Sequence, residues 1–180
     1  MAHEIYDKGL TPGKSGNVSM KIPHSSDYIL ITPSGVSLRN VGINNVLVID
    51  YNGHKVEGEG NPSSEVHMHL EIYGTRDDVG AVVHTHSPYA TGFSFSDEEI
   101  MKFEGFGKIK EPFIKKIKYA TPGSDKLVEL ASHALEKEDV VILKNHGVVT
   151  VGLNIDEAVL LAEFTESSAK TSFVINALRK

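Results

Sequence analysis

The sequence predicts a single α/β domain in which helices cover a mixed, largely antiparallel sheet. Three observations support this class. Short β-branched runs alternate with helical patterns, the strands and helices do not repeat in regular βαβ order, and Asn52-Gly53 marks a tight hairpin. The 180 residues, 40% of them hydrophobic, fit one domain over residues 1–180 with a sizeable core.

The first half of the chain is expected to supply strands at 17–22, 28–32 and 46–50, each rich in residues that favour β-structure. A helix should then begin at the Ser63-Ser64 turn and end near Gly74. In this prediction a serine caps the free amides, and the carboxylate of the next residue lies in the first turn, where the helix dipole favours it.

The second half should alternate strands and helices around one segment without a clear pattern. A capping arrangement of Asn154 with Glu157 predicts the start of the last helix. The segment without a clear pattern, 93–113, is expected to be a mobile loop. The expected elements are a buried strand at 81–85, a short helix from Pro88, an amphipathic helix at 124–135, strands at 140–143 and 147–151, and a helix to about Leu178.

Composition excludes several classes of partner and ligand. The net charge of −6 and the pI near 5.8 give no electrostatic reason to expect a nucleic-acid partner. The absence of cysteine leaves only nitrogen and oxygen ligands for a metal. The apolar runs are too short to span a membrane, and the N-terminus lacks the apolar core of a signal peptide, so we expect a cytoplasmic protein.

Three histidines follow apolar runs that are expected to be strands: His84 and His86 in AVVHTHS, and His146 in VVILKNHGV. Side chains two residues apart on a strand point to the same face, so the first two can bind one ion. Three imidazoles with an open fourth position are typical of catalytic zinc, while separate surface or core histidines are the alternative interpretation. His67 and His69 share the spacing but lie in an expected helix, where such positions diverge, so we expect no metal role there.

Three turns of small residues offer backbone amides and hydroxyl groups at a strand end or helix start. They are KSGN at 14–17, TPSG at 32–35 and PSSE at 62–65. The last is the strongest candidate for an anion site, because a helix N-terminus adds a positive dipole to unpaired N–H groups. Each turn alone is also explained as an ordinary cap or turn. Beside a bound phosphate, Glu65 can serve to move a proton at a substrate carbon.

Six motifs, in order along the chain, resemble those of the class II aldolase/adducin family. The resemblance runs from about Leu10 to Leu178. It implies a three-layer α/β/α sandwich and a homotetramer with active sites at subunit interfaces. The motifs are SGNVS at 15–19, LITPSG at 30–35, PSSE at 62–65, HTH at 84–86, YATPGS at 119–124 and NHG at 145–147.

The resemblance also implies a role for each candidate residue. His84, His86 and His146 would bind one Zn²⁺ per subunit, and Glu65 would be the catalytic acid and base. The substrate would be a small sugar phosphate. Its phosphate would be held by six residues of the three turns: Gly16, Asn17, Ser34, Gly35, Ser63 and Ser64.

The implied reaction is reversible cleavage of a ketose 1-phosphate, such as L-fuculose 1-phosphate, to dihydroxyacetone phosphate and an aldehyde such as L-lactaldehyde. A methylthioribulose-1-phosphate dehydratase and a pentulose-5-phosphate 4-epimerase are alternatives on the same fold, and glutamate rather than aspartate at position 65 favours the aldolase over the epimerase. A non-catalytic adducin-type assembly domain is a further alternative, although it would need neither the histidines nor Glu65. Family aldolases have a tyrosine proton donor near 100–110, where this chain has Phe103 and Phe106, so Tyr119, water and a neighbouring subunit stay open as donors.

Overall fold

The computed structural model describes residues 1–25, 27–103 and 111–179. Within them, eight strands form one sheet in the order β4-β3-β2-β1-β5-β8-β7-β6. All neighbouring pairs are antiparallel except β6 and β7, so the predicted mixed, largely antiparallel sheet is confirmed. The strands are β1 (Asn17–Lys21), β2 (Tyr28–Ile31), β3 (Leu47–Asp50), β4 (Lys55–Glu57), β5 (Ala81–Thr85), β6 (Lys115–Ile117), β7 (Val140–Leu143) and β8 (Val148–Gly152).

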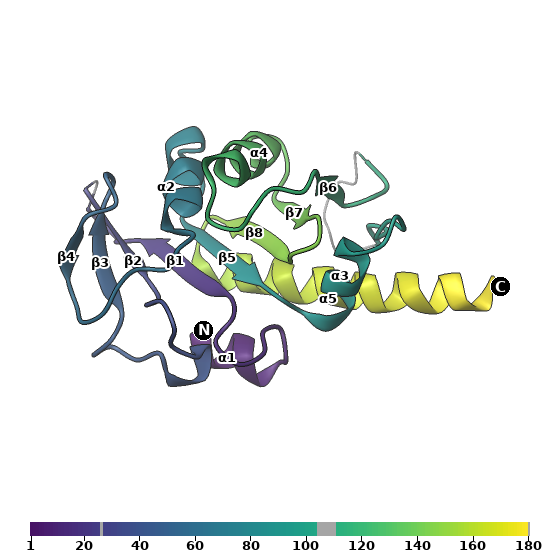
Figure 1. Ribbon diagram of the computed structural model, residues 1–180, viewed down its shortest axis with the longest axis horizontal. Coiled ribbons are helices and arrows are strands. Elements are labelled where there is room, and N and C mark those ends of the chain that lie inside the picture. The colour runs from purple at the N-terminus through teal and green to yellow at the C-terminus, as the bar shows by residue number, and fades with distance from the viewer. Residues whose placement is uncertain (26, 104–110, 180) are drawn as a thin grey trace.

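Helices cover both faces of the sheet, which confirms the three-layer arrangement (Figure 1). One layer holds α2 (Val66–Thr75) and α4 (Asp125–Leu135). The opposite layer holds α1 (Ala2–Asp7), the 3-10 helix Leu38–Asn40, α3 (Pro88–Ser94) and α5 (Ile155–Leu178), whose C-terminal part extends past the sheet in Figure 1. In the described part of the chain, no helix has the length and apolar character needed to cross a bilayer.

The alternation of side chains along β5 decides which layer the candidate site faces. Ala81 and Val83 pack in the cluster that includes α5, whereas Val82 packs in the cluster that includes α2 and α4. Because alternate residues of a strand point to opposite faces, His84 shares the face of Val82. The first histidine is therefore directed toward the layer in which α2 begins.

Several predicted boundaries are confirmed by the capping contacts that define them. The Ser124 side chain accepts a hydrogen bond from Leu127 N at 3.2 Å at the start of α4, and the Asn154 side chain accepts one from Glu157 N at 3.0 Å at the start of α5. The predicted hairpin joins β3 to β4 through Gly53, whose φ of 86° lies in the left-handed region that glycine adopts readily.

The prediction for the start of α2 is wrong. Glu65 is the residue that precedes the helix, not a member of its first turn, and no side chain caps this end. The Ser63 hydroxyl instead accepts a hydrogen bond from Glu65 N at 3.3 Å, which forms a local turn before the helix. As a result, Glu65 is directed by the turn and not by the helical repeat.

The helix α1 and the strand β6 were not predicted, and they are only six and three residues long. The predicted loop at 93–113 begins inside α3, and Ile100 within it is fully buried. Residues 104–110 of that loop, including Phe106, lie outside the described residues.

Candidate active site

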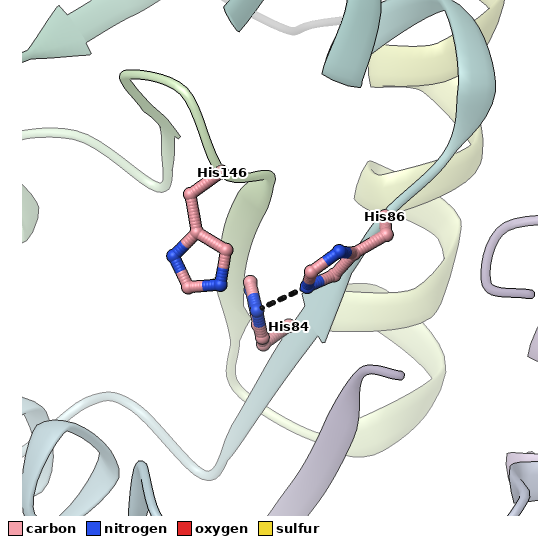
Figure 2. A group of neighbouring side chains, drawn as sticks. All are labelled: His84, His86 and His146. Atoms are coloured by element: carbon pink, nitrogen blue, oxygen red, sulfur yellow. Dashed lines mark hydrogen bonds between the residues drawn. The ribbon is translucent and has the colours of Figure 1, made fainter. Parts of the chain in front are cut away.

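The rings of His84, His86 and His146 face one another at one end of the sheet (Figure 2). Ring centroids are 4.8 to 5.0 Å apart, and one nitrogen from each ring lies within 4.8 Å of the other two. His84 belongs to β5, His86 follows the strand end, and His146 lies in the turn between β7 and β8. The structure thus brings together all three residues predicted as ligands.

The protonation of these rings fits a bound cation. His84 Nδ1 donates a hydrogen bond to the carbonyl oxygen of Val148 at 2.9 Å, so Nε2 is the ring nitrogen left to bind a proton or a cation. That atom is 2.9 Å from His86 Nε2, a separation that needs a proton or a cation to offset lone-pair repulsion. Burial, and then the neighbouring histidines, lower the pKa of His86 and of His146 to about 4, which leaves both rings neutral and able to coordinate metal at neutral pH.

The turn that carries His146 depends on two unusual backbone positions. Asn145 has a φ of 56°, in the left-handed region where asparagine is among the residues best tolerated. A Cβ atom on Gly147 would lie 2.4 Å from the carbonyl oxygen of Thr85 and 3.2 Å from the ring of His84. Glycine is therefore required for this turn to approach the end of β5.

Glu65 lies beside the histidines and is buried, with 6% of its surface exposed. Its Oε2 is 3.2 Å from His84 Nε2 and accepts a hydrogen bond from Asn17 Nδ2 at 3.0 Å, while its Oε1 is 3.7 Å from His146 Nε2. Burial alone would raise the pKa of Glu65, but His84, the bond from Asn17 and His146 together lower it. Glu65 is therefore a carboxylate at neutral pH.

Strand register explains why Asn17 reaches this carboxylate. Asn17 is the cross-strand partner of His84 in the pairing of β1 with β5. Cross-strand partners point to the same face with Cβ atoms about 5 Å apart, so the two side chains meet above the sheet. Asn17 was predicted only as a phosphate ligand, and its contact with Glu65 depends on a register that one sequence does not reveal.

The three turns of small residues line one pocket of about 200 Å³ together with Glu65, His86 and His146. A bridge between Pro33 and Pro62 holds two of the turns together, outside any strand. All six residues predicted to hold a phosphate are in the lining. Four further residues line the pocket without having been predicted as phosphate ligands: Lys14, Ser15, Pro33 and Pro122.

Gly16 fixes the distance between this pocket and the histidines. Its φ is 76°, and an added Cβ atom would lie 2.8 Å from the carbonyl oxygen of His84 and 2.8 Å from Thr11 Oγ1. The turn at 14–17 therefore packs with its main chain directly against the main chain of β5, and only glycine allows this approach.

His67 and His69 diverge, as the helical spacing predicts. His67 is exposed, whereas His69 is fully buried on α2, where its Nδ1 is 2.7 Å from the Ser19 hydroxyl. The same hydroxyl is 2.7 Å from the phenol oxygen of Tyr73. Neither His67 nor His69 belongs to the histidine cluster found among the described residues.

The buried His69 should make the stability of the metal-free protein depend on pH. Burial lowers its pKa from 6.5 to about 3, so between these values the unfolded chain binds a proton that the folded chain does not. The contribution of the neutral His69 to the free energy of unfolding is present above pH 6.5 and is lost as the pH falls. By pH 5 the free energy of unfolding has decreased by about 2 kcal/mol through this residue. In urea unfolding, wild type should lose about 2 kcal/mol more than His69→Gln between pH 7 and pH 5. Equal losses would contradict this assignment.

Comparison with known proteins places the chain and its fold in one class of enzyme. The family described as the class II aldolase and adducin N-terminal domain matches residues 1–173. The chain therefore belongs to the class II aldolase and adducin family. Within it the protein is a lyase of the class II aldolase type, in agreement with the aldolases among its relatives.

Individual relatives cover nearly the whole chain. The L-fuculose phosphate aldolase of Methanococcus maripaludis (strain C7) is 39% identical over 179 residues, which are 99% of this chain and 96% of the relative. The 3-oxo-tetronate 4-phosphate decarboxylase of Haemophilus influenzae is 31% identical, with 97% and 84% covered. A solved structure of an L-fuculose 1-phosphate aldolase superposes with a TM-score of 0.90 at 32% identity and covers 99% of this chain and 84% of that one.

Proposed function

We propose that this protein is a zinc-dependent aldolase that reversibly cleaves a ketose 1-phosphate, such as L-fuculose 1-phosphate, to dihydroxyacetone phosphate and an aldehyde such as L-lactaldehyde. The observation that carries the proposal is the single pocket in which three turns of small residues lie beside Glu65, His86 and His146. The turns suited to bind an anion and the carboxylate of Glu65 are therefore close enough to contact the same small substrate. The names of the most similar relatives agree with this substrate class.

The residues of the pocket divide the work of the reaction. The turns hold the phosphate and so orient the sugar, which converts remote binding energy into correct placement of the reacting carbons. When bound by His84, His86 and His146, zinc supplies Lewis acidity that stabilises negative charge on substrate oxygens.

Proton movement falls to Glu65. In cleavage the C3–C4 bond breaks and the C4 hydroxyl becomes the aldehyde as it passes its proton to water, Tyr119 or a group of a neighbouring subunit. C3 keeps the electron pair and gains a proton that the Glu65 carboxylate has first taken up from water. In synthesis Glu65 removes that proton. Its Oε2 is held by Asn17, while its Oε1 has no hydrogen-bond partner among the described residues and is the atom suited to carry the proton.

A decarboxylase is the second candidate, because one relative is a 3-oxo-tetronate 4-phosphate decarboxylase. In such a substrate the ketone is β to the carboxylate, so loss of CO₂ leaves an electron pair on the carbon beside the ketone, as aldol cleavage does. The same pocket and the same proton donor serve both reactions. The dehydratase and the epimerase remain further alternatives on the same fold.

Product identification separates these candidates. Zinc-loaded protein is incubated in turn with L-fuculose 1-phosphate, 3-oxo-tetronate 4-phosphate, methylthioribulose 1-phosphate and L-ribulose 5-phosphate. We expect dihydroxyacetone phosphate and L-lactaldehyde from the first, detected by NADH-coupled reduction of the triose and by NMR of the aldehyde. Release of CO₂, dehydration or epimerisation of another substrate, with no triose from the first, would assign the protein to another activity of the family.

We further propose a cytoplasmic homotetramer with active sites at subunit interfaces. An apolar groove of about 730 Å³ between α3 and α5 supports the presence of an interface, and Phe173 at its wall is 54% exposed. Tyr89 packs edge-to-face on Phe173 with ring centroids 5.6 Å apart. A purely structural adducin-type role would leave the buried Glu65 and the three clustered histidines without a purpose. Light scattering measures the mass in solution and tests the assembly independently of catalysis.

A further inference from the structure

The helix α3 follows the segment that carries His86 and contacts the turn that carries His146. It begins two residues after His86 and ends at Ser94, which is fully buried. The Ser94 carbonyl oxygen accepts a hydrogen bond from Asn145 N at 3.0 Å, and the Ser94 hydroxyl accepts one from His146 N at 3.2 Å. The last residue of α3 therefore holds the backbone of the turn between β7 and β8.

A buried carboxylate holds the other end of the same helix. Glu166 of α5 is 3% exposed, and its two oxygens accept hydrogen bonds from Tyr89 N at 3.1 Å and Ala90 N at 3.0 Å. Lys170 Nζ, from the next turn of α5, is 3.8 Å from the same carboxylate. Charge-assisted bonds to two adjacent amides fix both the position and the direction of the first turn of α3.

The ring of His146 needs such backbone support. His84 is oriented through its ring, because its Nδ1 donates to Val148 O. In contrast, His146 Nδ1 is buried with no hydrogen-bond partner in the described part of the chain. The direction of its Nε2 must then be set by the backbone at 145–146 and by packing, and Ser94 accepts hydrogen bonds from both amide groups of that backbone.

We propose that Ser94 and Glu166 are positioning residues of the metal site, with α3 as the rigid element that sets the separation of His86 and His146. Glu166 fixes the beginning of α3, and Ser94 transmits that position to the His146 turn. The proposal rests on the proposed function only in requiring that the three histidines bind zinc. It does not depend on which sugar phosphate is cleaved.

The test compares each residue with a matched neighbour. Ser94→Ala is paired with Ser96→Ala. The Ser96 hydroxyl lies just beyond α3, and its one hydrogen bond to the described residues is donated to the carbonyl oxygen of Phe93. Glu166→Gln is paired with Thr165→Val, since the buried Thr165 hydroxyl donates, within the described part of the chain, only to Leu161 O of α5. Zinc affinity is measured by competition with a chromophoric chelator, the visible spectrum of the Co²⁺-substituted protein reports ligand geometry, and thermal unfolding of the metal-free protein reports stability.

We expect Ser94→Ala and Glu166→Gln each to weaken zinc binding by about tenfold or more and to change the Co²⁺ spectrum, as loss of outer support for a ligand does in other metal sites. The two control variants should keep wild-type affinity and spectrum. Because both residues act through α3, the double variant should lose less affinity than the product of the single losses.

Wild-type zinc affinity and Co²⁺ spectrum in Ser94→Ala would overturn the proposal, as would equal losses in the control variants. If Glu166→Gln does not fold, the Ser94 and Ser96 pair decides the outcome alone. A wild-type protein that binds no zinc would instead refute the proposed function, so the two failures are distinguishable.

Discussion

Replacing Glu65 by glutamine is expected to lower kcat for cleavage by about 10²- to 10⁴-fold, the usual contribution of a positioned acid or base. Glutamine has nearly the same shape and can still accept the hydrogen bond from Asn17 Nδ2 through its amide oxygen. It cannot take up and release a proton at C3. Steady-state kinetics and the exchange of the C3 proton of dihydroxyacetone phosphate with D₂O, followed by NMR, measure the two consequences separately.

The control for this change is Glu71→Gln, at an exposed position of α2, the helix that Glu65 precedes. It removes an equal charge without touching the pocket, so kcat and proton exchange should stay at wild-type values. Zinc content is determined for both variants. A Glu65→Gln protein that contains zinc and exchanges the C3 proton at the wild-type rate would show that another group moves the proton.

Loss of the metal should have an effect of similar size. Zinc supplies several kcal/mol of charge stabilisation, and each 1.36 kcal/mol corresponds to a factor of ten in rate, so removal is expected to slow cleavage by about 10³-fold or more. Dialysis against a chelator should abolish measurable cleavage, and added Zn²⁺ should restore it. His146→Ala should reduce the zinc content from one ion per chain to nearly none, because only two nitrogen ligands remain.

His133→Ala is the matched control, since His133 is an exposed residue of α4 and lies outside the histidine cluster. It should retain one zinc ion and full activity. Elemental analysis accompanies each assay, so that the metal content is known and not assumed. Full activity in a preparation with verified absence of metal would refute the metal role of His84, His86 and His146.

The histidines could be predicted from sequence because their positions follow from local rules. An apolar β-branched run ends in each case at or just before a histidine, and the period of two along a strand places His84 and His86 on one side. Their convergence with His146 follows from the pairing of β5 with β8, which puts the end of one strand beside the start of the other. The resemblance to the family implied that His146 joins the other two histidines, but no pairing of their strands was predicted from the sequence.

The surroundings of Glu65 show where local rules fail. Serine followed by glutamate is a common start of a helix, yet here Ser63 bonds to Glu65 N and the helix begins one residue later. The contact with Asn17 depends on the register of β1 against β5, and register is set by the whole sheet. Ser94 and Glu166 gave no motif at all, since each acts through backbone groups far away in sequence.

Short elements were missed for a different reason. Residues 115–117, which form β6, include two lysines and resemble a solvated charge run more than a strand. Pairing with β7 provides the backbone hydrogen bonds, and the Lys116 ammonium group donates to the carbonyl oxygens of Ser96 and Glu98 at 2.8 Å. Tertiary contacts thus override a weak local preference.

Under the proposed function, the close packing of Gly16 on the main chain of His84 has a consequence for the choice of substrate. Two stretches of backbone in direct contact cannot slide apart in the way that long side chains can, so the anion pocket and the imidazoles stay a constant distance from each other. If the three turns hold the phosphate and the histidines hold the metal, the fold itself sets the spacing between the phosphate and the carbonyl group of the substrate. Residues elsewhere in the pocket would then decide which sugar is accepted beyond the cleaved bond. In that case the scaffold would select substrates by molecular length, and the rest of the pocket would select them by stereochemistry.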